Sequence, residues 1–70
     1  MEYKEVKEYV GKRVIVTDVD GKIFRGTITN TESEFDTESG KEEIEIETEG
    51  IYVGIPLDEI KSIVKIKRSI

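Results

Sequence analysis

The sequence contains no cysteine and no histidine among its 70 residues. Without cysteine the chain forms no disulfide and no thiolate metal site, and without histidine it lacks the usual zinc ligand and the usual general base. Alanine, glutamine and tryptophan are also absent, and Pro56 is the single proline. No nucleophile–base pair or phosphate-binding glycine loop is present. We therefore expect no enzyme, no catalytic residue, no cofactor and no metal ion.

No apolar run approaches the roughly 20 residues of a membrane span. The N-terminal stretch "MEYKEVKEYV" is charged throughout and has no apolar signal-peptide core. Seventy residues suffice for one small domain, here residues 1–70. The apolar content is mostly isoleucine and valine, which favour strands. These features predict a soluble, cytoplasmic, mainly β domain.

Hydrophobic periodicity predicts one short helix and five strands. Tyr3, Val6 and Val10 have helical spacing, which predicts a helix over residues 2–10 with Gly11 at its C-terminal cap. Alternation predicts strands at about 12–18, 22–30, 42–48, 51–55 and 62–67. Asp20-Gly21 and Glu49-Gly50 are typical of two-residue hairpin turns. The segment "PLDEI", which precedes the last strand, is predicted to form one helical turn.

This order of elements predicts an all-β fold, a small, strongly bent, closed five-stranded SH3-like or Sm-like barrel with a short N-terminal α-helix. Gly26 in the middle of the second strand indicates a sharp bend or a close backbone approach. The predicted core comprises Val14, Val16, Phe24, Ile28, Ile44, Ile46, Val53, Ile55, Ile60, Val64 and Ile66.

The stretch "VGKRVIVTDVDGKIFRGTITNTESEFD" resembles the first motif of the Sm-like (LSm) family. The positions that carry this resemblance are Val14, Val16, Gly21, Phe24, Gly26, Ile28, Glu32 and Phe35-Asp36. Ile55, Ile60 and Ile63 match the aliphatic positions of a looser second motif. The resemblance implies rings in which strand 4 of one subunit joins strand 5 of the next, and RNA binding by two loops.

The family's RNA-binding positions are altered in this chain. Glu32 stands at the family's Asp position, Asp36 at its Asn position, and Pro56-Leu57 at its Arg-Gly position. An ionised Asp only accepts hydrogen bonds, whereas Asn also donates them. The RNA-loop positions Glu32, Phe35, Asp36, Pro56 and Leu57 are therefore not expected to form a uridine pocket. The resemblance also implies that Phe35 tucks against the end of the barrel.

Charge is distributed very unevenly along the chain. Residues 30–50 hold nine acidic residues and one base, Lys41, whereas the remainder holds ten bases and seven acids. The acidic stretch is either a solvated surface or a protein-recognition face. A calcium loop starting at Glu32 is a poorer match, because Thr37 stands where an EF-hand needs glycine. We expect residues 31–41 to be the most mobile part of the chain.

The strictly alternating charges define a possible interaction face. Its residues are Glu43, Glu45, Glu47 and Tyr52, with Lys65 and Lys67 on the outer side of strand 5.

The predicted function is a non-catalytic Sm-like binding and assembly module. Its expected partner is a protein or a second copy, through strands 4 and 5, without a membrane. One alternative is an RNA-binding Sm-like regulator, and another is an engineered or phage-type barrel that acts as an acidic nucleic-acid mimic.

Overall fold

Five antiparallel strands form one sheet in the computed structural model, which describes residues 1–67. The strands are β1 (Arg13–Asp18), β2 (Ile23–Glu32), β3 (Glu43–Thr48), β4 (Ile51–Pro56) and β5 (Ile60–Lys65). Their order in the sheet is β4-β3-β2-β1-β5. The predicted all-β class is confirmed. The expected closure is incomplete, because β4 and β5 are the two edges of the sheet and do not pair with each other in the described residues.

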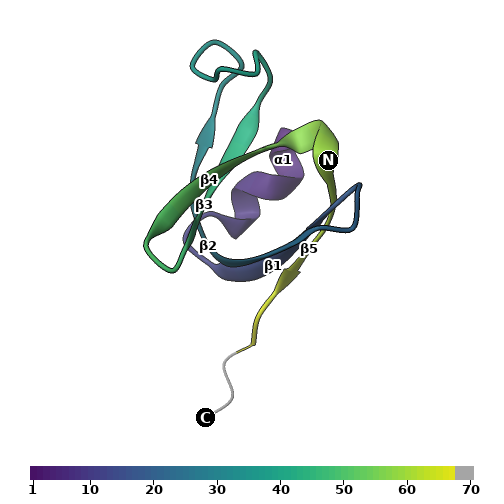
Figure 1. The fold of residues 1–70 in the computed structure, drawn as a ribbon, viewed down its shortest axis with the longest axis vertical. Helices are drawn as coiled ribbons and strands as arrows, with labels where there is room; N and C mark the ends of the chain where they lie inside the picture. The colour runs from purple at the N-terminus through teal and green to yellow at the C-terminus, as the bar shows by residue number, and fades with distance from the viewer. Residues whose placement is uncertain (68–70) are drawn as a thin grey trace.

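The sheet bends strongly around its interior, and Figure 1 shows α1 inside the curve, with the β2–β3 hairpin projecting past one end. Gly26 in β2 is buried, and a Cβ atom there would overlap the carbonyl group of Glu47 on β3. The predicted close backbone approach at Gly26 is therefore confirmed. The β2–β3 register also shifts between Ile28 and Asn30, and a bulge of this kind bends the longer strand.

The N-terminal helix is shorter than the predicted range of 2–10. It consists of α1 (Tyr3–Val6) followed by one 3₁₀ turn, η1 (Lys7–Tyr9). Val6 is fully buried, whereas Tyr3 and Val10 are exposed, so only one member of the predicted stripe packs into the core. So short a segment is helical only where packing holds it. No helix among residues 1–67 is long and apolar enough to cross a membrane.

The core consists of inward-facing aliphatic side chains from all five strands and α1. Nine of the eleven predicted core positions are buried or pack against this core, with Phe24 and Val53 only partly buried. Sequence reasoning did not place Val6, Leu57 and Ile63 in the core. The buried hydrophobic residues are Val6, Val14, Val16, Ile28, Ile44, Ile46, Ile55, Leu57, Ile60 and Ile63.

The predicted phase of the last strand was wrong. β5 begins at Ile60 rather than at residue 62, and Ile63 lies opposite Val16 and faces the interior. Val64 lies opposite Ile15 on the outside and is 57% exposed. Ile66 is half-buried beyond the end of β5. A register shift between Thr17 and Asp18 accompanies the earlier start, and it sets which side chains of β5 face inward.

The connections between strands differ in how well they were predicted. Glu49 and Gly50 both have positive φ, at 51° and 82°, and form the predicted two-residue turn between β3 and β4. The first hairpin has a three-residue loop instead, because the backbone N–H of Asp18 donates to the carbonyl of Lys22. The predicted helical turn is present as a 3₁₀ turn, η2 (Leu57–Glu59).

Candidate protein-interaction surfaces

The outer side of the β3–β4 hairpin carries an acidic face. Glu43, Glu45 and Glu47 alternate with buried isoleucines along β3, as predicted, so all three carboxylates lie outside the barrel. Tyr52 on β4 lies opposite Glu47 and is 63% exposed. We call Glu43, Glu45, Glu47 and Tyr52 the acidic face.

Each carboxylate of the acidic face accepts a hydrogen bond from an uncharged donor. The donors are the hydroxyl of Ser39 to Glu43, the hydroxyl of Thr29 to Glu45, and the backbone N–H of Gly50 to Glu47, each at 2.7 Å. Among residues 1–67 the only ion pairs are those of Lys41 with Asp58 and Glu59. The negative charge of the acidic face therefore has no cationic partner within the described part of the chain.

The acidic face continues into an open hollow of about 440 Å³ beside the end of β2. Glu32 lies directly opposite Glu43 in the β2–β3 ladder, and like charges in this arrangement repel. Asp36 and Glu38 line the same hollow. A cationic side chain from a partner would relieve this repulsion.

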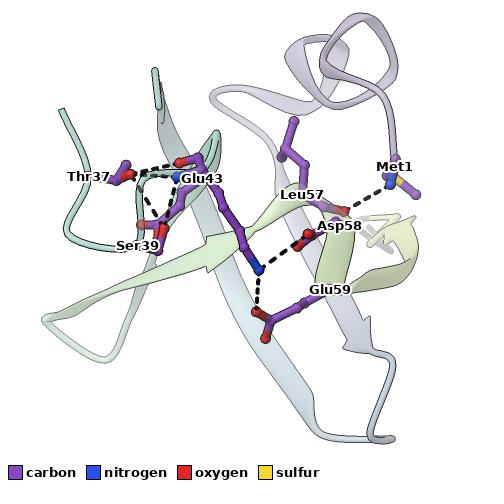
Figure 2. A network of polar contacts seen from close by, with 8 residues as sticks. Met1, Thr37, Ser39, Glu43, Leu57, Asp58 and Glu59 are labelled. Carbon is purple, nitrogen blue, oxygen red and sulfur yellow. Dashed lines mark hydrogen bonds and ion pairs between the residues drawn. The ribbon is translucent and has the colours of Figure 1, made fainter. Parts of the chain in front are cut away.

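The loop between β2 and β3, residues 33–42, is held by polar contacts. The hydroxyl of Thr37 donates to the carbonyl of Lys41 at 2.7 Å, and the Lys41 N–H donates back to that hydroxyl at 3.1 Å. Lys41 also reaches across to η2, where its Nζ lies 3.3 Å from an Asp58 carboxylate oxygen and 3.9 Å from one of Glu59 (Figure 2). The backbone N–H of Leu57 donates to the carbonyl of Glu42 at 2.9 Å. These contacts join the base of the loop to the β4–β5 connection.

The five RNA-loop positions do not converge on one pocket. Leu57 is only 5% exposed and belongs to the core, where its carbonyl accepts a hydrogen bond from the Met1 amino group (Figure 2). Glu32 ends β2, and Pro56 ends β4. Asp36 accepts a hydrogen bond from the Ser33 hydroxyl at 3.0 Å.

Phe35 contradicts the expectation that it tucks against the barrel. Its side chain is 89% exposed and is absent from the core cluster. The loop turns at this point through a hydrogen bond from the Asp36 N–H to the Ser33 carbonyl, at 3.0 Å. This turn lies in the part of the hairpin that projects past the barrel, so the ring has no apolar surface to pack on (Figure 1).

The edge of β4 exposes backbone groups as well as side chains. Residues that flank a two-residue turn form a hydrogen-bonded pair, and hydrogen-bonded pairs then alternate along the ladder. Thr48 and Ile51 flank the turn, so the backbone N–H and C=O of Tyr52 and Gly54 point away from β3. Pro56, which has no N–H, ends this free edge.

The edge of β5 carries the opposite charge. Lys61 and Lys65 are exposed on β5, and Lys67 is exposed just beyond its end. The expected alternation of Lys65 and Lys67 on the outer side was wrong, because Lys65 lies opposite the inward-facing Val14 and Lys67 lies outside the strand. The predicted interaction face is therefore divided between the two edges of the sheet.

Sequence reasoning missed a second outer surface, formed by β1, β2 and β5. Ile15 lies opposite both Arg25 and Val64, which places these side chains in one row across the outside of the sheet. We call Arg13, Ile15, Ile23, Arg25 and Val64 the arginine face. Alternation along β1 and β2 already places Arg13, Ile15, Ile23 and Arg25 opposite in phase to the buried residues, so the pattern could have identified this part of the surface, whereas Val64 joins it only through the phase of β5.

Within residues 1–67, no group of three or more Asp or Glu side chains is placed to hold a metal ion. No protein-family model matches the chain, and no curated protein or solved structure is significantly similar to it. The two strand edges and the two outer faces are therefore the basis for a functional proposal.

Proposed function

We propose that the chain is a non-catalytic, Sm-like binding module that assembles with copies of itself. In this assembly the β4 edge of one copy pairs with the β5 edge of the next. The observation that carries the proposal is that both edges are unpaired in the described residues, while their flanking charges are opposite.

Three features of the edges support this pairing. The outward backbone groups of Tyr52 and Gly54 are free to form a ladder with another strand. Tyr52 and Ile51 on β4 are large exposed apolar side chains that lose contact with water in such a contact. The acidic residues of β3 lie beside one edge, and Lys61 and Lys65 lie on the other. The Sm-like resemblance predicts the same strand pairing.

Pairing two different edges is a head-to-tail contact. It generates a ring if the rotation between successive copies brings the last copy back to the first, and a filament if it does not. An uncapped edge is also open to unspecific aggregation, which natural proteins avoid by covering or charging it. A specific partner edge of opposite charge would satisfy the free groups of β4 and β5.

The test removes one free backbone donor of β4. Tyr52→Pro eliminates an N–H that the β3–β4 ladder does not use, so we expect a folded protein that no longer forms the edge-paired assembly and sediments as a monomer at dilutions where the parent still assembles. Tyr52→Thr, the matched control, keeps that N–H and the strand propensity while removing the ring, and should weaken assembly without abolishing it. Analytical ultracentrifugation of the parent and both variants measures the effect. If Tyr52→Pro assembles as the parent does, the edge proposal is wrong.

RNA binding, the alternative function, has less support. Leu57 is buried at one RNA-loop position, and Lys41, the only base in the acidic stretch, is already paired with Asp58. We expect filter-binding titrations with U-rich and A-rich RNA at low salt to show no submicromolar binding. Tight binding that weakens as salt rises would favour the hypothesis of an RNA-binding regulator, because phosphate contacts release counterions.

A further inference from the structure

Phe35 is the most exposed large hydrophobic residue of the described chain. Its side chain is 89% exposed, although burial of an aromatic ring stabilises a protein by a few kcal/mol. Single exposed aliphatic residues are common on protein surfaces, but an aromatic ring on a projecting turn is typical of an interface anchor. Nothing in the proposed pairing of strand edges uses this ring.

The turn that carries Phe35 has hydrogen bonds of its own. Ser33 and Asp36 hold it through two hydrogen bonds of 3.0 Å, one from the Ser33 hydroxyl and one from the Asp36 N–H. Further along the loop, Lys41 is anchored to Asp58 on η2. An ordered loop loses less conformational entropy on binding than a flexible one. The structure therefore presents the ring in a shape that suits docking.

The residues beside Phe35 define the chemistry of the surface it fits. Glu34 and Asp36 are its sequence neighbours and are both exposed, and Glu38 follows within the same loop. An apolar anchor surrounded by carboxylates requires an apolar site with a basic rim, because a neutral or acidic rim would leave these charges uncompensated. The complementary surface must combine aliphatic and cationic side chains.

The arginine face of the same chain has this composition. Ile23 is 67% exposed and Val64 is 57% exposed, and Ile15 lies between β2 and β5 in the same sheet. Arg13 and Arg25 are exposed on this outer side and form no ion pair among residues 1–67. Glu47 and Glu49 border a hollow that these arginines also line, without pairing with them. Two free guanidinium groups thus flank an exposed aliphatic row.

We infer that the Phe35 turn of one copy docks on the arginine face of another copy. Phe35 packs against Ile23 and Val64, and the carboxylates of Glu34 and Asp36 face Arg13 and Arg25. This contact uses surfaces other than the β4 and β5 backbone edges, so it is a second and independent interface. It is also head-to-tail, because the loop and the face are different surfaces of one chain.

Two variants, each of which disrupts one of the two surfaces, test the inference. Both are made in a chain that carries Tyr52→Pro, which removes the edge pairing. Phe35→Ser disrupts the loop, and Arg25→Glu disrupts the arginine face. In the Tyr52→Pro background we expect concentration-dependent association by sedimentation, measured up to about 1 mM, and each added variant should weaken it about tenfold or more. Mixing the two variants should restore association but limit it to 1:1 dimers, since only one good loop and one good face remain.

Two results would overturn the inference: a mixture as monomeric as its components, or a Tyr52→Pro protein that stays monomeric over the whole range. A second measurement does not depend on the proline variant. In the otherwise unmodified chain, the NMR methyl signal of Ile23, which lies on the inner strand β2, should shift with concentration, and Phe35→Ser should abolish that shift. An Ile23 shift that persists in Phe35→Ser contradicts docking of the loop. The proposal of edge pairing is tested separately, and it is wrong if Tyr52→Pro assembles as the parent does.

Discussion

The barrel and the β2–β3 loop are held together by different forces. In the barrel, inward side chains such as Val14, Ile28 and Ile46 are fully buried. In residues 33–42 no large apolar side chain is buried, and the contacts are hydrogen bonds and the ion pairs of Lys41. Burial of apolar surface dominates folding free energy, whereas exposed polar contacts contribute little. The difference indicates that the barrel determines the fold and that substitutions in the loop should change stability little.

Truncation of a core side chain should give the largest loss of stability. Ile46 is fully buried in β3, and Ile46→Ala should lower the free energy of unfolding by about 4 kcal/mol through lost burial and a cavity. Ile23→Ala on the outside of β2 is the matched control and should cost below about 0.5 kcal/mol. Urea denaturation monitored by circular dichroism measures both. Equal losses would mean that Ile46 does not face the interior of the sheet and Ile23 its outer side.

The close approach of β2 to β3 predicts the next largest effect. Gly26→Ala places a methyl group against the Glu47 carbonyl, so the backbones must separate, at a cost of about 3 kcal/mol. Gly54→Ala is the control, because its Cβ meets only the side-chain end of Glu43, which moves easily. Thermal unfolding of the two variants should show a much lower melting temperature for Gly26→Ala alone. Similar melting temperatures would contradict the strong bend at Gly26.

A smaller loss is expected at the β1–β2 turn. Asp18 is the only buried charged residue of the described chain, and one of its carboxylate oxygens accepts the N–H groups of Asp20 and Lys22 at 2.9 and 2.8 Å. Asp18→Ala leaves these donors unpaired and should cost about 2 kcal/mol. Asp20→Ala, in the exposed part of the same turn, should be nearly neutral. Chemical denaturation distinguishes them, and equal stabilities would show that the turn does not depend on this side chain.

Changes within the loop should have the smallest effects on folding. Phe35→Ala should change stability by less than about 0.5 kcal/mol, because the ring is already exposed. Replacing Glu32, Glu34 and Glu38 together by glutamine should also stay within about 0.5 kcal/mol, or stabilise slightly by relieving repulsion. Thermal melting with and without millimolar calcium checks both. A large loss in the triple variant, or stabilisation of the parent alone by calcium, would make the loop a structural cation site.

Alternation in the sequence predicted most of the fold because it reports directly on which side chains share a face. All five strands lie within about two residues of their predicted bounds, since β-branched alternation and the turn glycines mark most of them clearly. The predicted phase of the last strand was wrong because Ile63 and Val64 are adjacent, so alternation there fits two opposite phases. The phase is set by pairing with Val16 and by the register shift at Thr17, which are contacts distant in sequence.

The candidate surfaces were less predictable than the fold. The carboxylates of β3 followed from alternation, but the exposure of Phe35 did not, because apolar residues are buried by default and the projection of the hairpin is a tertiary feature. The arginine face has no comparable signature in the sequence, because Arg13 and Arg25 are far apart along the chain and only strand pairing brings them to one surface. Which strands are edges depends on the order β4-β3-β2-β1-β5, and periodicity alone does not determine strand order.

The molar mass of the unmodified chain, measured by light scattering over a concentration series at low and at high salt, tests the assembly proposal most directly. The monomer is 8.0 kDa. The proposal predicts a mass that rises to a multiple of this value with concentration, and that falls toward it at high salt because charge complementarity at the edges is screened. A mass that stays at the monomer value up to about 1 mM at low salt would contradict it.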